Sequence, residues 1–495
     1  MTMPESLANL ATAAAVVCLA TGIGHGILNV IGLRRIGSRE RVVFSFAVGV
    51  VGMSLAALPL AHLGLLRTWP VRIIMVLLLA PLLPAIRVLV RNLRSASIVT
   101  IFLARCSLLE KTLVVIIATQ ALVILVSIAA PGITGDQATS QDAMLAVHQP
   151  PPGPRLVQAI LDLGSALQSR TATGWLTPIF IGAAGAAVYL LARRFWPRKV
   201  AILAAASFLI TPQLASSLQL RAQEAALAFF VVASFLALAI YRRSRSEART
   251  PALVLIALLS GAAAGSSPAG AIHLLLVGPM VFLVPVLLFQ EHTRVVLKRF
   301  ALYAAIAIVL AAGWYAGSWT APGTARLPIP KLTELATDNP DADLGRTLVS
   351  LLTCPWSLTM RVQGDDDPFT GTPGPLPLAF IPLLLLLPDR PSRPLKSILF
   401  YCAAYVIYAF FVRQPGQSLL PILGLASVAT AVGIDRMERL APVAARVAVA
   451  AVILAYAANV AVSAHVADAA GDRLSAAVDI QAGDFGRAGH PDAPH

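Results

Sequence analysis

The sequence predicts an all-α, polytopic membrane protein with about 14 transmembrane helices, and three observations lead to that fold class. Hydrophobic residues make up 57% of the 495 positions and charged residues only 13%, which is too apolar for a chain folded in water. Apolar runs of about 20 residues, enough to cross roughly 30 Å of hydrocarbon, recur along almost the whole chain. Basic and non-basic connections alternate between these runs, as they do in a helical bundle that crosses a bilayer repeatedly.

The apolar runs predict where each helix begins. The first run, residues 7–31, has no basic residue before it and no small-residue cleavage site after it, so we expect a retained helix rather than a signal peptide. Neighbouring runs are joined by short loops, apart from two long connections over residues 131–173 and 318–374. The expected helix starts are Leu7, Val42, Val71, Thr112, Trp175, Val200, Ala225, Leu253, Ile272, Ala301, Leu376, Ile398, Leu419 and Val443.

Lysine and arginine gather in every second connection, which predicts the orientation of the chain. The basic connections are 34–41, 91–111, 193–199, 242–245, 294–299, 390–396 and 436–439. By the positive-inside rule these face the cytoplasm, so that both long loops and both termini face outward. The formal net charge of +14 is then a consequence of membrane topology, and no nucleic-acid partner is expected.

The organisation along the chain suggests three parts. Residues 1–110 are expected to form accessory transmembrane helices and a basic cytoplasmic linker. Residues 111–465 form the main transmembrane module with the two outer loops, and residues 466–495 form a polar tail. The four cysteines, Cys18, Cys106, Cys354 and Cys402, have no CxxC spacing, so we expect neither a disulfide framework nor a zinc scaffold.

Ionisable residues are distributed in a way that argues against coupled transport. None of the apolar runs carries Asp, Glu or Lys in its middle, whereas ion-coupled transporters usually place such groups near the bilayer midplane. The interior ionisable side chains are histidines such as His25, His62 and His273. A single histidine in such a helix more often packs or forms hydrogen bonds than relays protons, so none is given a functional role.

Acidic residues collect instead on the predicted outer face. The first long loop contains Asp136, Asp142 and His148, and the next outer turn contains Arg221 and Glu224. Carboxylates near an arginine at the lipid–water boundary can act as a general base with an anion clamp, or as metal ligands beside a phosphate. This pattern favours chemistry on an amphiphilic, phosphate-bearing substrate; the alternative is that these are solvated loop charges.

Several sequence segments follow one another in the same order as in a known protein family. An outward helix is followed by the acidic loop and an amphipathic segment, residues 154–169, and then by YLLARRFWPRKVAILAAASFLITP and RAQEAALAFF. Later come LTCPWSLTM, PLPLAFIPLLLLLP and RQPGQSLLPILGLASVATAVGID. In this order, residues 111–433 resemble the GT-C superfamily of glycosyltransferases, which includes the protein mannosyltransferase-like and aminoarabinose transferase-like groups that use polyprenyl-phosphate sugars.

The resemblance implies a catalytic arrangement on the outer side of a bacterial inner (cytoplasmic) membrane. A carboxylate of the first loop, Asp136 or Asp142, would be the general base, and Asp136 ranks ahead because it lies closer to the helix end. His148, which follows Asp142 as in a motif of some family members, would contact the substrate, and Glu224 would orient the acceptor. A divalent metal, Mg²⁺ or Mn²⁺, held by Asp136 and Glu224 is an option that the resemblance leaves open.

The resemblance also implies the partners: a polyprenyl-phosphate-linked sugar donor, a lipid, glycan or protein acceptor, and membrane lipids. The donor phosphate would be met by basic residues of the outer side, namely Arg221, Lys331, Arg361 and Arg413. Near the last motif the chain has Gln417 and Ser418 where related enzymes commonly have Arg and Tyr. The alternative functions are a transporter or flippase for lipid-linked sugars, and an envelope-assembly scaffold.

Overall fold

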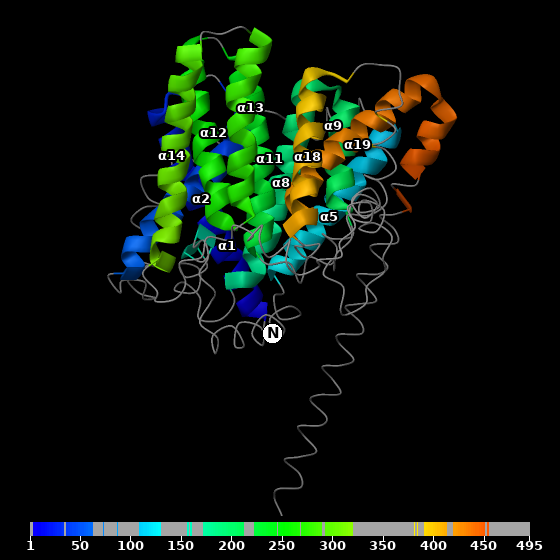
Figure 1. Ribbon diagram of the computed structural model, residues 1–495. Coiled ribbons are helices and arrows are strands. Elements are labelled where there is room, and N and C mark those ends of the chain that lie inside the picture. Colours follow the sequence, from blue (N-terminus) through cyan, green and yellow to red (C-terminus); the bar gives the residue numbers. More distant parts are fainter. Residues whose placement is uncertain are drawn as a thin grey trace, which may run out of the picture.

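The computed structural model of the chain describes a bundle of helices (Figure 1). Within the described residues all regular secondary structure is helical, and seven helices are long and apolar enough to cross a membrane. This confirms a multi-pass helical protein, whereas the predicted total of about 14 helices is not confirmed. The described residues are 3–33, 36–62, 73, 87, 108–129, 156–157, 159–160, 172–211, 222–244, 246–267, 269–289, 293–319, 381, 384, 391–412, 419–450 and 453–454.

The helices start close to where the apolar runs predict them. Those expected near Val71 and Leu376 fall almost entirely outside the described residues. The labelled helices are α1 (Met3–Val30), α2 (Ser38–His62), α5 (Leu108–Ala129), α8 (Ala172–Phe195), α9 (Arg198–Leu209), α11 (Ala222–Arg243), α12 (Ser246–Ser266), α13 (Gly270–Phe289), α14 (Thr293–Trp319), α18 (Arg393–Val412) and α19 (Leu420–Leu440).

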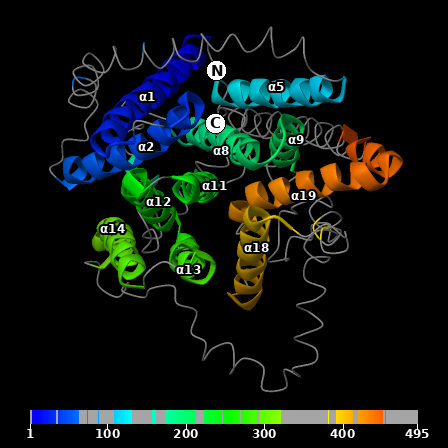
Figure 2. The ribbon, with the colours of Figure 1, turned by 90° about the horizontal axis from the view of Figure 1, so that it is seen from above.

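Helix α11 is the centre of the bundle. It contacts α8, α12, α19, α2 and α13, and Figure 2 shows it surrounded by them. Nearly all of its residues from Ala225 to Tyr241 are buried, because its sequence is apolar on every face rather than on one stripe. By contrast α14 lies at the edge, and it exposes large side chains such as Val309 and Ile308 in the way that a lipid-facing helix does.

Helix α9 differs from the prediction of a full span starting near Val200. It has 12 residues, so its length is about 18 Å, shorter than the roughly 30 Å hydrocarbon core. All its residues from Val200 to Leu209 are buried, and it packs against α8 and α19. Its last turn closes through Ile210 and Thr211, just before Pro212 in the sequence, which disfavours helical backbone at the residue before it.

The first two helices form a hairpin held by small residues. Cβ atoms added to Gly24 and Gly49 would lie 1.8 Å from the Ser45 carbonyl oxygen and 1.6 Å from that of Ala20, so the two backbones are in direct contact there. Close backbone approach of this kind is how helices associate in lipid, where burial of apolar side chains gives little advantage.

This hairpin belongs to the same hydrophobic core as the later helices. Phe46 of α2 lies against Phe180 of α8 and Phe229 of α11, with ring centroids 6.1 and 5.6 Å apart. Leu156 and Ile160, from the predicted amphipathic segment of the first long loop, are helical and buried in that core as well. Division of the chain at residues 110 and 465 stays a prediction; the first boundary falls in the first turn of α5, and residue 465 lies outside the described residues.

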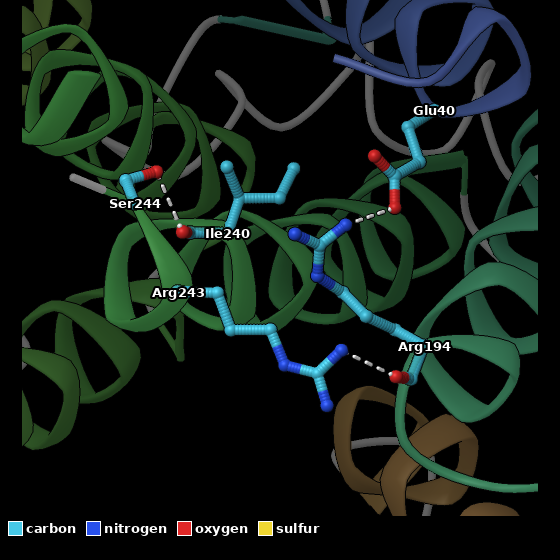
Figure 3. Close-up of polar contacts among 5 residues, drawn as sticks. All are labelled: Glu40, Arg194, Ile240, Arg243 and Ser244. Carbon is cyan, nitrogen blue, oxygen red and sulfur yellow. Dashed lines mark hydrogen bonds and ion pairs between the residues drawn. The ribbon is translucent and has the colours of Figure 1, made fainter. Parts of the chain in front are cut away.

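One end of the bundle, here called the basic end, is joined by charged side chains (Figure 3). Glu40 Oε1 of α2 accepts a hydrogen bond from Arg194 Nη1 of α8 at 2.5 Å. Arg243 of α11 donates to the Arg194 carbonyl oxygen at 2.9 Å and lies over the Phe195 ring at 4.8 Å. Ser244 ends the helix by donating to the Ile240 carbonyl oxygen at 2.8 Å.

Two further contacts extend the basic end across the bundle. Arg242 of α11 donates to Ser397 of α18 at 3.1 Å, and Lys199 of α9 pairs with Glu438 of α19. These contacts involve six helices, α2, α8, α9, α11, α18 and α19, at the end where the sequence predicts the cytoplasm. Met3, where α1 begins, lies at the opposite end, as that topology requires (Figure 1).

A charge swap at the basic end tests this arrangement. The Glu40–Arg194 pair is only 14% and 21% exposed, so we expect a coupling free energy of roughly 1–2 kcal/mol in a double-mutant cycle. Glu40→Arg alone should lower the midpoint of thermal unfolding in detergent, and adding Arg194→Glu should restore most of the loss.

The matched control is the Asp435–Arg439 pair within α19, whose arginine is 66% exposed. Its coupling should be about 0.3–0.5 kcal/mol, as for other exposed pairs four residues apart in a helix. Equal coupling energies for the two pairs would contradict a structural role for Glu40 and Arg194.

Candidate functional site

Glu224 is the predicted site residue that the structure describes. It lies in the first turn of α11, at the end of the bundle away from the basic end. A carboxylate at this position is favoured by the partial positive charge of the helix N-terminus. Its Oε2 atom is buried although the residue as a whole is partly exposed. The sequence RAQEAALAFF thus places a single acidic group where α11 meets the outer boundary of the apolar bundle.

Helix α18 runs antiparallel to α11, which brings its second half to the Glu224 end. Arg242 contacts Ser397 at the basic end, and midway along the pair Phe235 meets Tyr401 with ring centroids 4.9 Å apart. From that contact toward the outer end, α11 runs back through the sequence to Glu224, and α18 runs forward through Tyr405 and Tyr408 to Val412. Glu224 is eleven residues from Phe235 and Tyr405 is four from Tyr401, so Tyr405 lies about 10 Å deeper in the bundle than Glu224.

Three tyrosines form a ladder along α18. The ring centroids of Tyr401 and Tyr405 are 6.1 Å apart, and those of Tyr405 and Tyr408 are also 6.1 Å apart with the rings edge to face. Tyr405 is fully buried, and its hydroxyl has no hydrogen-bond partner in the described part of the chain. A buried hydroxyl without a hydrogen-bond partner is costly and marks a place where a ligand group or water can bind.

A buried hydrogen-bond chain fixes the base of the ladder. Ser234 of α11 donates to the Val231 carbonyl oxygen at 2.7 Å, so its oxygen is left to accept from His273 Nε2 of α13 at 2.8 Å. His273 Nδ1 then accepts from the Tyr401 hydroxyl at 2.8 Å. This assignment satisfies every donor with a neutral imidazole protonated at Nε2, and it links α11, α13 and α18.

The structure describes only part of the site that the sequence predicts. Glu224 lies at the expected helix start, and His273 is a hydrogen-bonding residue as expected. His25 is partly exposed in α1, and the side chain of His62 lies outside the described residues. The other predicted site residues also lie outside the described residues: Asp136, Asp142, His148, Arg221, Lys331, Arg361 and Arg413.

A metal centre finds no support within the described residues, which contain no group of three His, Cys, Asp or Glu side chains. The proposed pair of Asp136 and Glu224 stays a prediction because only Glu224 is described. Cys18 and Cys402 are free thiols, while Cys106 and Cys354 lie outside the described residues.

The tyrosine ladder and Ser234 were missed by sequence reasoning. One signal was present: Tyr401, Tyr405 and Tyr408 follow the i, i+4, i+7 spacing that places side chains on one face of a helix. No comparable signal pointed to Ser234. Serines are common in transmembrane helices, and only the packing of α11 against α13 brings this one to the imidazole of His273.

The arrangement can bind polar groups at one end and excludes charge from the middle. In the described helices, acidic and basic residues lie near the ends, and the interior polar groups are neutral hydroxyls and imidazoles. Such a bundle lacks, in its described spans, the midplane carboxylate on which ion coupling commonly depends. At the Glu224 end it offers a carboxylate acceptor and a phenol, which are suited to hydroxyl groups.

No protein-family model and no curated protein sequence matches the chain. Among solved structures, the chain is similar to the crystal structure of the Archaeoglobus fulgidus oligosaccharyltransferase in the apo form, with 17% identity and a TM-score of 0.38. The similarity covers 64% of this chain and 48% of that one, so the chain spans about half the length of that protein. Such a TM-score does not establish a shared fold, and it carries no weight for the function.

Proposed function

We propose that this protein is an integral-membrane glycosyltransferase that moves a sugar from a polyprenyl-phosphate donor to a lipid, glycan or protein acceptor. The observation that carries the proposal is Glu224, a partly buried carboxylate at the end of the bundle opposite the basic end. The order of charged outer segments in the sequence supports the same function, because Asp136 and Asp142 precede Glu224 on the same predicted side.

The proposed reaction is a displacement at the anomeric carbon of the donor sugar. Asp136 or Asp142 takes the proton from the acceptor hydroxyl as that oxygen bonds to the anomeric carbon. The bond from this carbon to the phosphate oxygen breaks, and the bonding pair leaves with the polyprenyl phosphate. Arg221 or Arg413 stabilises the charge on the departing phosphate, with Lys331 and Arg361 as further candidates.

Glu224 orients the acceptor hydroxyl in this scheme. A divalent metal would neutralise the donor phosphate if it were bound. The described residues supply only one carboxylate for such an ion, so no step of the reaction is assigned to it. What this chain contributes at the described site is an acceptor of hydrogen bonds in a place largely shielded from water.

The proposed location is a bacterial cytoplasmic membrane, with the Glu224 end facing outward. The concentration of Arg and Lys at the basic end supports this orientation by the positive-inside rule. A polyprenyl-phosphate sugar would then meet the site at the outer boundary of the bilayer, where its phosphate lies among interfacial basic residues.

Transfer activity is the direct test. The protein in lipid nanodiscs is mixed with radiolabelled polyprenyl-phosphate sugars and an envelope extract, and the Asp136→Ala/Asp142→Ala double variant is compared with the wild type. Loss of a general base should lower the rate by about 10²–10⁴-fold. Asp435→Ala, at the basic end, is the matched control and should transfer at the wild-type rate.

Two outcomes would overturn the proposal. If the double variant transfers at the wild-type rate, the first-loop carboxylates are not the base. If folded wild-type protein transfers none of several donors but moves them across proteoliposome membranes, the protein is a transporter of lipid-linked sugars.

A further inference from the structure

We propose that the basic end holds one anionic phospholipid on helix α18. The lipid phosphate lies beside Arg242, Arg393 and Lys396, and an acyl chain follows the apolar face of α18 below them. This site is at the opposite end of the bundle from Glu224, and it does not depend on the transfer reaction. Its basis is a cation without a counter-charge, placed where a charged surface meets an apolar one.

Arg242 differs from other cations that reach into the bundle at the basic end. Arg194 has a carboxylate partner in Glu40. Lys199 likewise has one in Glu438. In the described part of the chain Arg242 makes no ion pair, and its contact is with a neutral hydroxyl. A guanidinium held partly out of water without a carboxylate is costly, so an anion from outside the chain would stabilise it.

The hydrogen bond that Arg242 does make places its guanidinium at the edge of α18. Its Nη1 atom donates to the Ser397 hydroxyl at 3.1 Å, and that hydroxyl donates to the Arg393 carbonyl oxygen at 3.2 Å. The Nη2 atom is buried and has no hydrogen-bond partner among the described residues, although the side chain as a whole is partly exposed. A phosphate can therefore approach the guanidinium from its open side and form charge-assisted hydrogen bonds.

One face of α18 changes from basic to apolar along the helix. Arg393 and Lys396, in its first turn, are exposed, and on the same face Phe400 and Ile407 are 64% and 45% exposed. The 11 residues from Lys396 to Ile407 rise about 16 Å, close to the roughly 15 Å that one leaflet contributes to the hydrocarbon core. This face therefore matches a phospholipid in length and in the order of its charged and apolar parts.

This combination of surfaces favours an anionic phospholipid over other ligands. Inorganic phosphate would be attracted by the cations but would leave Phe400 and Ile407 uncovered. A zwitterionic lipid would cover the apolar face, but its ammonium group would be repelled by the charge of Arg242. Figure 2 shows α18 on the outside of the bundle between α13 and α19, where a lipid can reach it. Basic residues between helices at a cytoplasmic boundary are a known environment for anionic headgroups.

Helix α14 offers a comparison within the same chain. Arg294 and Lys298 are exposed at the basic end, above exposed apolar side chains such as Leu302 and Val309. Helix α13 separates α14 from α18 (Figure 2). Exposed charges are well solvated and contribute little to binding, whereas a partly buried guanidinium interacts more strongly with an anion. We therefore expect the tighter lipid site to be at Arg242.

Lipid titration followed by native mass spectrometry tests the site. Detergent-solubilised protein is titrated with phosphatidylglycerol or with phosphatidylcholine of the same acyl chains, and the Kd of the first bound lipid is measured. We expect at least tenfold tighter binding of phosphatidylglycerol. Arg242→Gln should raise its Kd about tenfold, through loss of a charge-assisted contact, and leave phosphatidylcholine binding unchanged. Arg294→Gln, which removes the same charge from α14, is the matched control and should keep the wild-type Kd.

A second variant tests the site without altering a packed residue. Lys396 is exposed, so Lys396→Gln should fold like the wild type, and it should raise the Kd for phosphatidylglycerol about threefold. Inorganic phosphate and glycerophosphoglycerol, which lack acyl chains, should not displace the bound lipid at millimolar concentration.

Three results would overturn the proposal. Equal affinity for the two lipids would show that the cations do not select the headgroup. Equal effects of Arg242→Gln and Arg294→Gln, or wild-type binding by Lys396→Gln, would show that lipid binds anywhere on the basic end. Displacement by inorganic phosphate would show a site for a soluble anion. Since no sugar donor is involved, none of these results bears on the proposed transfer activity.

Discussion

Replacing Gly49 with leucine is expected to be among the most disruptive single changes in the described part of the chain. A Cβ atom at this position would lie 1.6 Å from the carbonyl oxygen and 2.4 Å from the carbonyl carbon of Ala20. Both are backbone atoms of α1, which cannot turn aside as a side chain would. The two helices must separate, and the hairpin loses its closest contact, so we expect a loss of about 3 kcal/mol or more.

The measurement is the fraction of monodisperse protein that remains after heating, followed by fluorescence-detected size exclusion in detergent. Gly26→Leu is the matched control, because a Cβ atom on Gly26 of the neighbouring helix meets nothing within 4 Å. We expect Gly26→Leu to match the wild type and Gly49→Leu to aggregate at a clearly lower temperature. Equal thermal stability of the two variants would show that α1 and α2 do not approach each other as closely as described.

The second large effect is expected from His273→Leu. This change removes both buried hydrogen bonds of the imidazole and leaves the Tyr401 hydroxyl and the Ser234 hydroxyl without their histidine partner. Leaving a buried polar group unsatisfied costs about 1–3 kcal/mol, so the variant should lose roughly 2–4 kcal/mol of stability. Adding Tyr401→Phe should recover part of the loss, because it removes the hydroxyl that His273→Leu leaves unsatisfied.

A second histidine provides the control for this prediction. His25 of α1 is partly exposed, and its Nδ1 atom makes no hydrogen bond in the described part of the chain. His25→Leu should therefore change the unfolding temperature little, by the equivalent of about 0.5 kcal/mol or less. If His25→Leu and His273→Leu are equally destabilising, or if Tyr401→Phe makes His273→Leu worse, the hydrogen-bond chain does not hold the three helices together.

The candidate site shows where sequence reasoning reaches its limit. The helix start at Glu224 could be predicted, since an acidic residue opens an apolar run of more than 15 residues. The contact of Arg242 with Ser397, which brings α18 alongside α11, could not be predicted, because 155 residues separate them and no periodicity links one helix to another. The ranking of His273 as a packing or hydrogen-bonding residue was right, but its partners Ser234 and Tyr401 come from two other helices.

What the sequence by itself determined is the class of the protein. The length and spacing of the apolar runs fix a multi-pass helical fold, because each backbone polar group in lipid must be satisfied within its own segment. The alternating Arg and Lys residues define a basic end, which the contacts of Glu40–Arg194 and Arg242–Ser397 then locate in three dimensions. These properties depend on local composition, so they can be read along the chain.

Only the tertiary structure decided which helices are neighbours and which is innermost. Apolar helices have nearly uniform surfaces, so hydropathy does not reveal that α11 lies at the centre or that α9 is a short interior helix. Contacts in lipid depend instead on small residues such as Gly49 and on isolated polar side chains such as His273. Their partners lie on other helices, so the physical interactions that build the site exist only after the bundle has assembled.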